Sequence, residues 1–150
     1  MKLRTLNKRS KLVKKDSIGK KYNHFLQLLK ELNKRQLSVE ILAAINGEID
    51  KINAVSTSEK EFEKQLATSQ HFILKLIEKE LQLVAKNHYR NTWLAIGMAA
   101  FGIPLGVAFG SSLGNIAYIG IGLLFGFVIG IAVGSSKDQN AAKEGRQLNW

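Results

Sequence analysis

The chain has no cysteine and a single proline, and its residues 91–136 contain no Asp, Glu, Lys, Arg or His. The lack of cysteine excludes a disulfide framework, a thiolate nucleophile and a cysteine-ligated zinc site. Histidine is also scarce: His24, His71 and His88 stand alone in the sequence and form no ligand pair of the HExxH kind. We therefore expect no catalytic residue, no metal site and no cofactor.

Two short motifs resemble functional ones but lack the necessary context. Residues 110–114 spell G-x-S-x-G, yet a nucleophile elbow needs a strand before it and a histidine after it, and no histidine follows His88. Residues 120–126 approach a dinucleotide-binding fingerprint but contain one residue too many and follow no βα unit. Neither motif supports an enzyme.

The uncharged block 91–136 decides the class of protein. About 20 apolar helical residues cross the roughly 30 Å core of a bilayer. As one helix the block would run about 69 Å, which is too long for a single crossing. Two crossings joined by a tight turn at 111–115 fit well. We predict a transmembrane hairpin, with a first span from about Thr92 to Gly110 or Leu113 and a second from about Ile116 to Gly134.

Glycine recurs at every fourth position in two runs within this block. Because residues i and i+4 share a helix face, each run forms a face without side chains, and such faces let helix backbones approach closely. Ala95 and Ala99 are expected to extend the first face, and Pro104 to bend it. The ladders predict tight packing, either within the hairpin or between copies. Their members are Gly102, Gly106, Gly110, Gly114, Gly122, Gly126, Gly130 and Gly134.

The positive charge is concentrated at the N-terminus. Residues 1–21 hold nine Lys or Arg against one acid, whereas 22–90 are close to balance. We expect residues 1–16 to form a flexible basic arm attracted to anionic lipid, by about 1 kcal/mol per cation near the surface. Phosphate contacts to nucleic acid are an alternative, disfavoured because no aromatic residue precedes Tyr22; a simple solubilising tail is another. The candidate charges are Lys8, Arg9, Lys11, Lys14 and Lys15.

Residues 17–90 predict a cytoplasmic domain of about three amphipathic helices. Apolar residues recur at helical spacing in three rows, with Ser38 and Ser58 as candidate caps of the second and third helices. The third helix is expected to continue to about Arg90, and its drifting row does not favour a regular coiled coil. The rows are Ile18, Tyr22, Phe25, Leu29 and Leu32; Leu42, Ile45, Ile49 and Ile52; and Phe62, Leu66, Ile73, Ile77, Leu81 and Val84.

The flanks of the hairpin predict its orientation. Lys86, Tyr89, Arg90 and Trp93 form an aromatic and basic border typical of a membrane interface. The turn between the spans has no charge, whereas both flanks, including the tail 137–150, carry Lys and Arg. Under the positive-inside rule both termini are cytoplasmic, and we expect a multi-pass protein of the cell's inner membrane.

The residues from Asn91 to about Leu148 resemble the bacterial glycine-zipper family of small membrane proteins. The resemblance rests on AFGIPLGVAFGSSLGN at 100–115, YIGIGLLFGFVIGIAVGSS at 118–136 and AKEGRQL at 142–148. It implies membrane location and close helix packing rather than an activity, and it covers a little over a third of the chain.

Together these patterns predict an all-α protein with a cytoplasmic helical bundle followed by a two-helix transmembrane hairpin. The first functional hypothesis is a scaffold or interaction module that self-associates through its glycine faces and binds a protein partner with residues 17–90. The second is a pore or channel subunit, disfavoured because no ionisable residue lies within the spans. A third, weaker hypothesis is a membrane tether for nucleic acid. The expected partners are the lipid bilayer and further copies of the chain.

Overall fold

The computed structural model describes residues 2–7, 16–55 and 58–150. Apart from two strands of two residues each, β1 (Val84–Ala85) and β2 (Gln147–Leu148), which pair with each other, its regular elements are helices, as predicted. The chain forms two compact units, Met1–Val84 with Leu148–Trp150, and Ala85–Gln147. These bounds differ from the predicted ones: the second unit begins earlier than residue 91, and the last three residues belong to the first.

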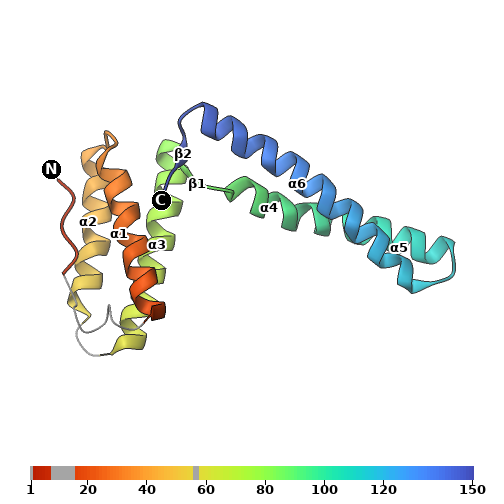
Figure 1. The fold of residues 1–150 in the computed structure, drawn as a ribbon, viewed down its shortest axis with the longest axis horizontal. Coiled ribbons are helices and arrows are strands. Elements are labelled where there is room, and N and C mark those ends of the chain that lie inside the picture. The colour runs from red at the N-terminus through yellow and green to blue at the C-terminus, as the bar shows by residue number, and fades with distance from the viewer. Residues whose placement is uncertain (1, 8–15, 56–57) are drawn as a thin grey trace. The chain divides into compact units, whose positions relative to one another are not determined.

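The described residues of the first unit form three helices, α1 (Asp16–Asn33), α2 (Val39–Ala54) and α3 (Glu59–Leu81) (Figure 1). Both predicted caps are present, because the hydroxyls of Ser38 and Ser58 accept the N–H groups of Ile41 and Glu61 at 3.3 and 3.0 Å. The predicted row of α1 is buried throughout. In α2 the buried row starts at Ile41 rather than Leu42.

The third helix is shorter than predicted. It ends at Leu81 because Gln82 adopts a left-handed conformation, with φ 54°. The N–H of Leu83 then reaches back to the carbonyl of Ile77 at 3.2 Å, a bond that closes the helix end. The expectation of a continuous helix to Arg90 was therefore wrong. A residue in the left-handed conformation that is not glycine gives little sign of a helix end in the sequence.

The core of the first unit is made of large apolar side chains. Those with no solvent exposure come from all three helices, and Leu148 joins them from the C-terminal end of the chain. Burial of these side chains removes apolar surface from water, which stabilises such a bundle. The fully buried members are Phe25, Leu28, Leu32, Ile45, Ile49, Ile52, Ile73, Ile77 and Leu148.

Residues 2–7 also belong to this unit and lie along α2 in extended form. The Asn46 amide accepts the N–H of Arg4 at 2.7 Å and donates to the carbonyl of Lys2 at 3.1 Å. The Asn53 amide likewise accepts the N–H of Asn7 at 2.9 Å and donates to the carbonyl of Thr5 at 3.2 Å. Two helical turns span about 10.5 Å, close to the length of three extended residues. The expected flexible arm 1–16 therefore does not describe residues 2–7.

The second unit is a helical hairpin. Its first limb, His88–Ser112, comprises α4 (His88–Gly97), the π-helical turn η1 (Met98–Gly102) and α5 (Ile103–Ser112). Its second limb, Ile116–Lys143, comprises the 3₁₀ turn η2 (Ile116–Tyr118) and α6 (Ile119–Lys143). The turn between them is the predicted one: Gly114 has φ +65°, and the N–H of Asn115 bonds to the carbonyl of Gly110 at 3.0 Å.

Candidate functional site

The glycine faces of the two limbs pack against each other within one hairpin. A Cβ atom added at Gly126 would lie 2.5 Å from the carbonyl oxygen of Gly97 and 2.7 Å from the Cα of Gly102. At Gly130 it would lie 2.5 Å from the carbonyl oxygen of Trp93, and at Gly122 it would meet the backbone of Gly106. Since real Cβ atoms do not come within 3.0 Å of backbone atoms, these positions accept only glycine in this arrangement. Of the two predicted arrangements, the structure shows packing within one hairpin.

The first glycine face extends beyond its predicted start at Gly102, to Gly97. Gly97 is buried and contacts Gly126 and Gly130, although it lies five residues before Gly102. The π-helical turn Met98–Gly102 absorbs the additional residue and returns Gly97 to the same face. Ala95 and Ala99, which we expected on this face, are exposed. Pro104 was a cue in the sequence, because proline and π-helical turns both occur where a helix departs from regular geometry.

The first ladder loses its close contacts towards the turn, whereas the second keeps them to its last member. Gly114 lies in the turn, where an added Cβ atom would meet nothing within 4 Å, so it packs against no helix. Gly110 has only an ordinary contact, 3.5 Å from the carbonyl oxygen of Asn115. Gly134 is a full member and would place a Cβ atom 2.5 Å from the Cα of Arg90.

The position that follows Gly134 on the glycine face of α6 is occupied by a buried carboxylate, Asp138. Asp138 lies four residues after Gly134 and is 7% exposed. Its two oxygens accept the N–H groups of Tyr89 and Arg90 at 3.1 and 2.9 Å. These are orphan donors at the start of α4, where Asn87 provides no side-chain cap. Asp138 therefore caps one limb from the other, a role that its position in a charged tail did not reveal.

The outer surface of the hairpin is apolar and exposed. Only 22% and 17% of the most apolar windows of the two limbs are buried within the protein. Both limbs are long and apolar enough to cross a membrane. Of the 15 large apolar side chains that are exposed in the described residues, 13 fall between residues 96 and 128. They are Ile96, Phe101, Ile103, Leu105, Val107, Phe109, Leu113, Ile116, Ile121, Leu124, Phe125, Phe127 and Val128.

The four predicted interface residues gather at the open end of the hairpin. Tyr89 and Arg90 supply the backbone that Asp138 caps, and Trp93 lies one turn further along α4. The ammonium of Lys137, from α6, lies 5.5 Å from the centre of the Trp93 ring, a cation–π contact. Lys86 and Arg90 line a cavity of about 300 Å³ at this end.

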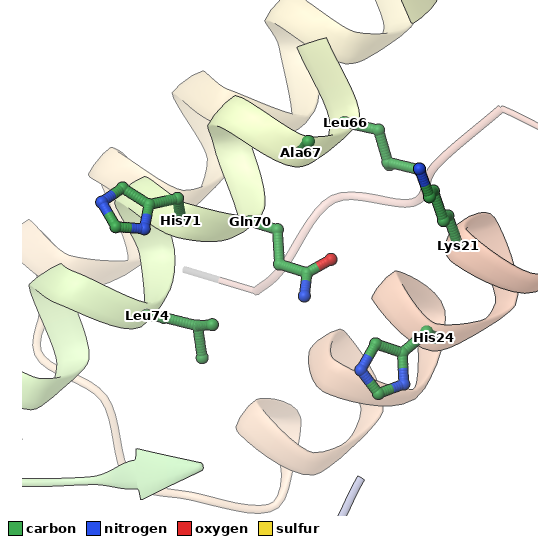
Figure 2. Close-up of a pocket in the computed structure, with 7 residues that line it drawn as sticks. All are labelled: Lys21, His24, Leu66, Ala67, Gln70, His71 and Leu74. Carbon is green, nitrogen blue, oxygen red and sulfur yellow. The ribbon is translucent and has the colours of Figure 1, made fainter. Parts of the chain in front are cut away.

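The first unit has an open pocket of about 340 Å³ between α1 and α3 (Figure 2). Gln70 and Leu74 extend into it from α3, and His24 extends into it from α1. The ammonium of Lys21, at its edge, pairs with Glu63 at 2.5 Å. No group of three or more potential metal ligands occurs within the described residues. Because its one cation is already paired, this pocket carries no strong preference for a ligand.

Glu48 is a buried charged residue of the first unit. Its carboxylate accepts the Lys51 ammonium at 2.6 Å and the Ser69 hydroxyl at 2.7 Å, and Gln65 donates to Ser69 at 3.0 Å. Burial raises the pKa of Glu48, but the hydrogen bonds from Lys51 and Ser69 and the charge of Lys51 lower it, and the pKa ends below its usual value. No pattern in the sequence distinguishes Glu48 from the exposed acids of these helices.

The basic residues at 8–15, namely Lys8, Arg9, Lys11, Lys14 and Lys15, lie outside the described residues. Comparison with protein-family models, with curated proteins and with solved structures finds no match to this chain. The resemblance to the glycine-zipper family therefore stays a prediction.

Proposed function

We propose that the protein is a membrane-anchored interaction module. The hairpin crosses the bilayer twice with both termini in the cytoplasm, and the first unit binds a protein partner there. One observation carries the membrane part of the proposal: the hairpin buries glycine and exposes Leu, Ile, Val and Phe along both limbs. Helices of a soluble core bury such side chains, whereas helices in lipid expose them and pack through small residues.

The same geometry bears on the other hypotheses. The glycine faces are occupied by the hairpin itself, so self-association would have to use its outer apolar surface. Backbone contacts along the limbs leave no channel inside a single hairpin, and the pore hypothesis gains no support. Two features typical of the glycine-zipper family are present: the four-residue spacing of glycine and the close approach of the helix backbones. They support, as part of the proposal, assignment of the hairpin to that family.

Two exposed apolar residues provide a matched test of membrane insertion. Leu124 in α6 is 66% exposed and Val39 in α2 is 63% exposed. A lysine near the centre of a span costs about 3 kcal/mol of insertion free energy, whereas on a solvated helix it costs little. Leu124→Lys should therefore increase the fraction of protein extracted from membranes by alkaline carbonate, and Val39→Lys should not. Equal behaviour of the two variants, or extraction of the native chain, would contradict the proposal.

A further inference from the structure

A polar cavity lies at the open end of the hairpin, where the proposed function places the lipid headgroups. Its volume is about 300 Å³, at the small end of ligand sites, which suits a headgroup rather than a whole lipid. All of its lining comes from the second unit: from the start of α4, from the last turns of α6 and from Gln147 of β2. The polar lining from the two helix ends is Lys86, Asn87, Arg90, Ser135, Asp138 and Gln139.

The charges of this cavity favour an anion. The side chains of Lys86 and Arg90 are exposed and form no ion pair with any part of the chain that the structure describes. The single acid in the lining, Asp138, directs both oxygens to the N–H groups of Tyr89 and Arg90. Those N–H groups are consequently not available to a ligand, and the two side-chain cations are the groups that would hold it.

The polar neighbours of the cations fit a phosphate with a hydroxylated substituent. Ser135, Asn87 and Gln139 offer hydroxyl and amide groups that both donate and accept hydrogen bonds. Arginine and lysine are the residues that recognise phosphate, arginine through a planar fork and lysine as a point charge. A headgroup that carries its own ammonium, such as choline, would place a third cation beside them.

The surroundings connect this polar site to an apolar surface. Trp93 and Lys137 form a cation–π pair next to it, an arrangement of aromatic and basic groups that suits the headgroup level. Beyond it, the limbs expose the apolar side chains described above. A molecule with a phosphate in the cavity would have a place for acyl chains along the helices.

We propose that this cavity binds the phosphate-bearing headgroup of an anionic glycerophospholipid. The inference rests on the proposed membrane insertion, which it makes more specific. Basic pockets at the cytoplasmic ends of membrane helices hold such headgroups by their charge and hydrogen-bonding groups. Bound in this way, a lipid would bridge the start of α4 and the end of α6, next to the Asp138 cap.

The test compares two double variants of the full chain in zwitterionic vesicles with added phosphatidylglycerol. Lys86→Gln with Arg90→Gln removes both cations of the cavity. Lys137→Gln with Lys143→Gln removes the same charge from the same end of the hairpin but leaves the cavity intact. At about 1 kcal/mol per cation, the first pair should weaken lipid binding about 20- to 30-fold. The second pair should weaken it only severalfold, because Lys137 and Lys143 do not line the cavity and lie further from the bound phosphate. Binding is measured by displacement of a spin-labelled phosphatidylglycerol.

Three results would overturn the assignment. Equal losses in both double variants would indicate general surface attraction, and equal binding of phosphatidylcholine by the native chain would indicate no headgroup selectivity. Competition by inorganic phosphate or glycerol phosphate as effective as by the lipid would indicate a soluble phosphate ligand. Carbonate extraction of the same samples separates these outcomes from failure of membrane insertion. Circular dichroism confirms that each variant retains its helices.

Discussion

The two units are both helical, but they bury opposite kinds of residue. In Met1–Val84 the fully buried residues are Phe, Leu and Ile from three helices, with Ser69 as a polar exception. In Ala85–Gln147 eight of the ten buried residues are glycine, and the large apolar side chains point outward. Water drives apolar side chains together in the first case. In the second unit, dispersion between closely packed backbones holds the two limbs together.

The largest effect is expected from removing volume in the first unit. Phe25 has no exposed surface, and Phe25→Ala should cost about 3–5 kcal/mol because it leaves a cavity. Hydrogen exchange followed by mass spectrometry should show faster exchange in α1–α3 and unchanged exchange in α4–α6. The exposed neighbour Gln27→Ala is the control. Faster exchange in both units at once would contradict this prediction, since it would mean that the two units unfold as a single cooperative structure.

Adding volume should damage the second unit instead. Gly126→Leu puts a side chain where even a Cβ atom would lie 2.5 Å from the Gly97 carbonyl oxygen. We expect the limbs to separate locally, at a cost of about 1–3 kcal/mol or more. SDS titration of the detergent-solubilised protein measures this through Trp93 fluorescence in a Trp150→Phe background. Gly120→Leu is the matched control, because a Cβ atom there would meet nothing within 4 Å. Similar SDS midpoints for the two variants would show that the glycine contacts do not hold the hairpin together.

The cap on α4 should contribute less. Asp138→Ala removes the acceptor of two backbone N–H groups, and loss of a capping side chain costs about 1–2 kcal/mol. The amides of residues 89 and 90 should exchange about 5- to 30-fold faster. Asp138→Asn should retain part of the protection, since asparagine also caps helices. Asn140→Ala, at an exposed position of the same helix, should change nothing; unchanged exchange in Asp138→Ala would count against the cap.

The smallest expected effect is a loss of stability of the first unit at low pH. The pKa of Glu48 in the folded protein lies below its ordinary value of 4.5. A depressed carboxyl pKa contributes stability above the unfolded pKa, and this stability is lost as pH falls through the folded value. Stability of the first unit should therefore fall below about pH 4.5, and Glu48→Gln, at a cost near 1 kcal/mol, should flatten that dependence. Urea unfolding at pH 7 and pH 3 measures it; a Glu48→Gln variant as acid-sensitive as the native chain would exclude this carboxyl as the cause.

Much of this architecture was predictable because periodicity records burial directly. The row of α1, the first four members of the α3 row and the serine caps of α2 and α3 were predicted from spacing alone, as was the position of the hairpin turn. The last predicted member of the α3 row, Val84, lies in β1 instead. The α3 terminus was missed because Gln82 adopts a positive φ without being glycine or asparagine. The ladder was misread at Ala95 and Ala99 because one π-helical turn changes which residues share a face. A strict four-residue repeat cannot reveal that change.

By itself, the sequence determined that this chain is all-α, that two of its helices are apolar enough to cross a membrane, and that glycine repeats along both. Composition and spacing suffice for these conclusions, because hydrophobicity and helical period are local properties. Only the tertiary structure decided that the glycine faces meet each other, that Asp138 caps α4, that Glu48 is buried against Ser69 and that residues 2–7 lie along α2. Each of these depends on groups more than a dozen positions apart in the sequence. Packing geometry and the need of buried polar groups for partners bring them together.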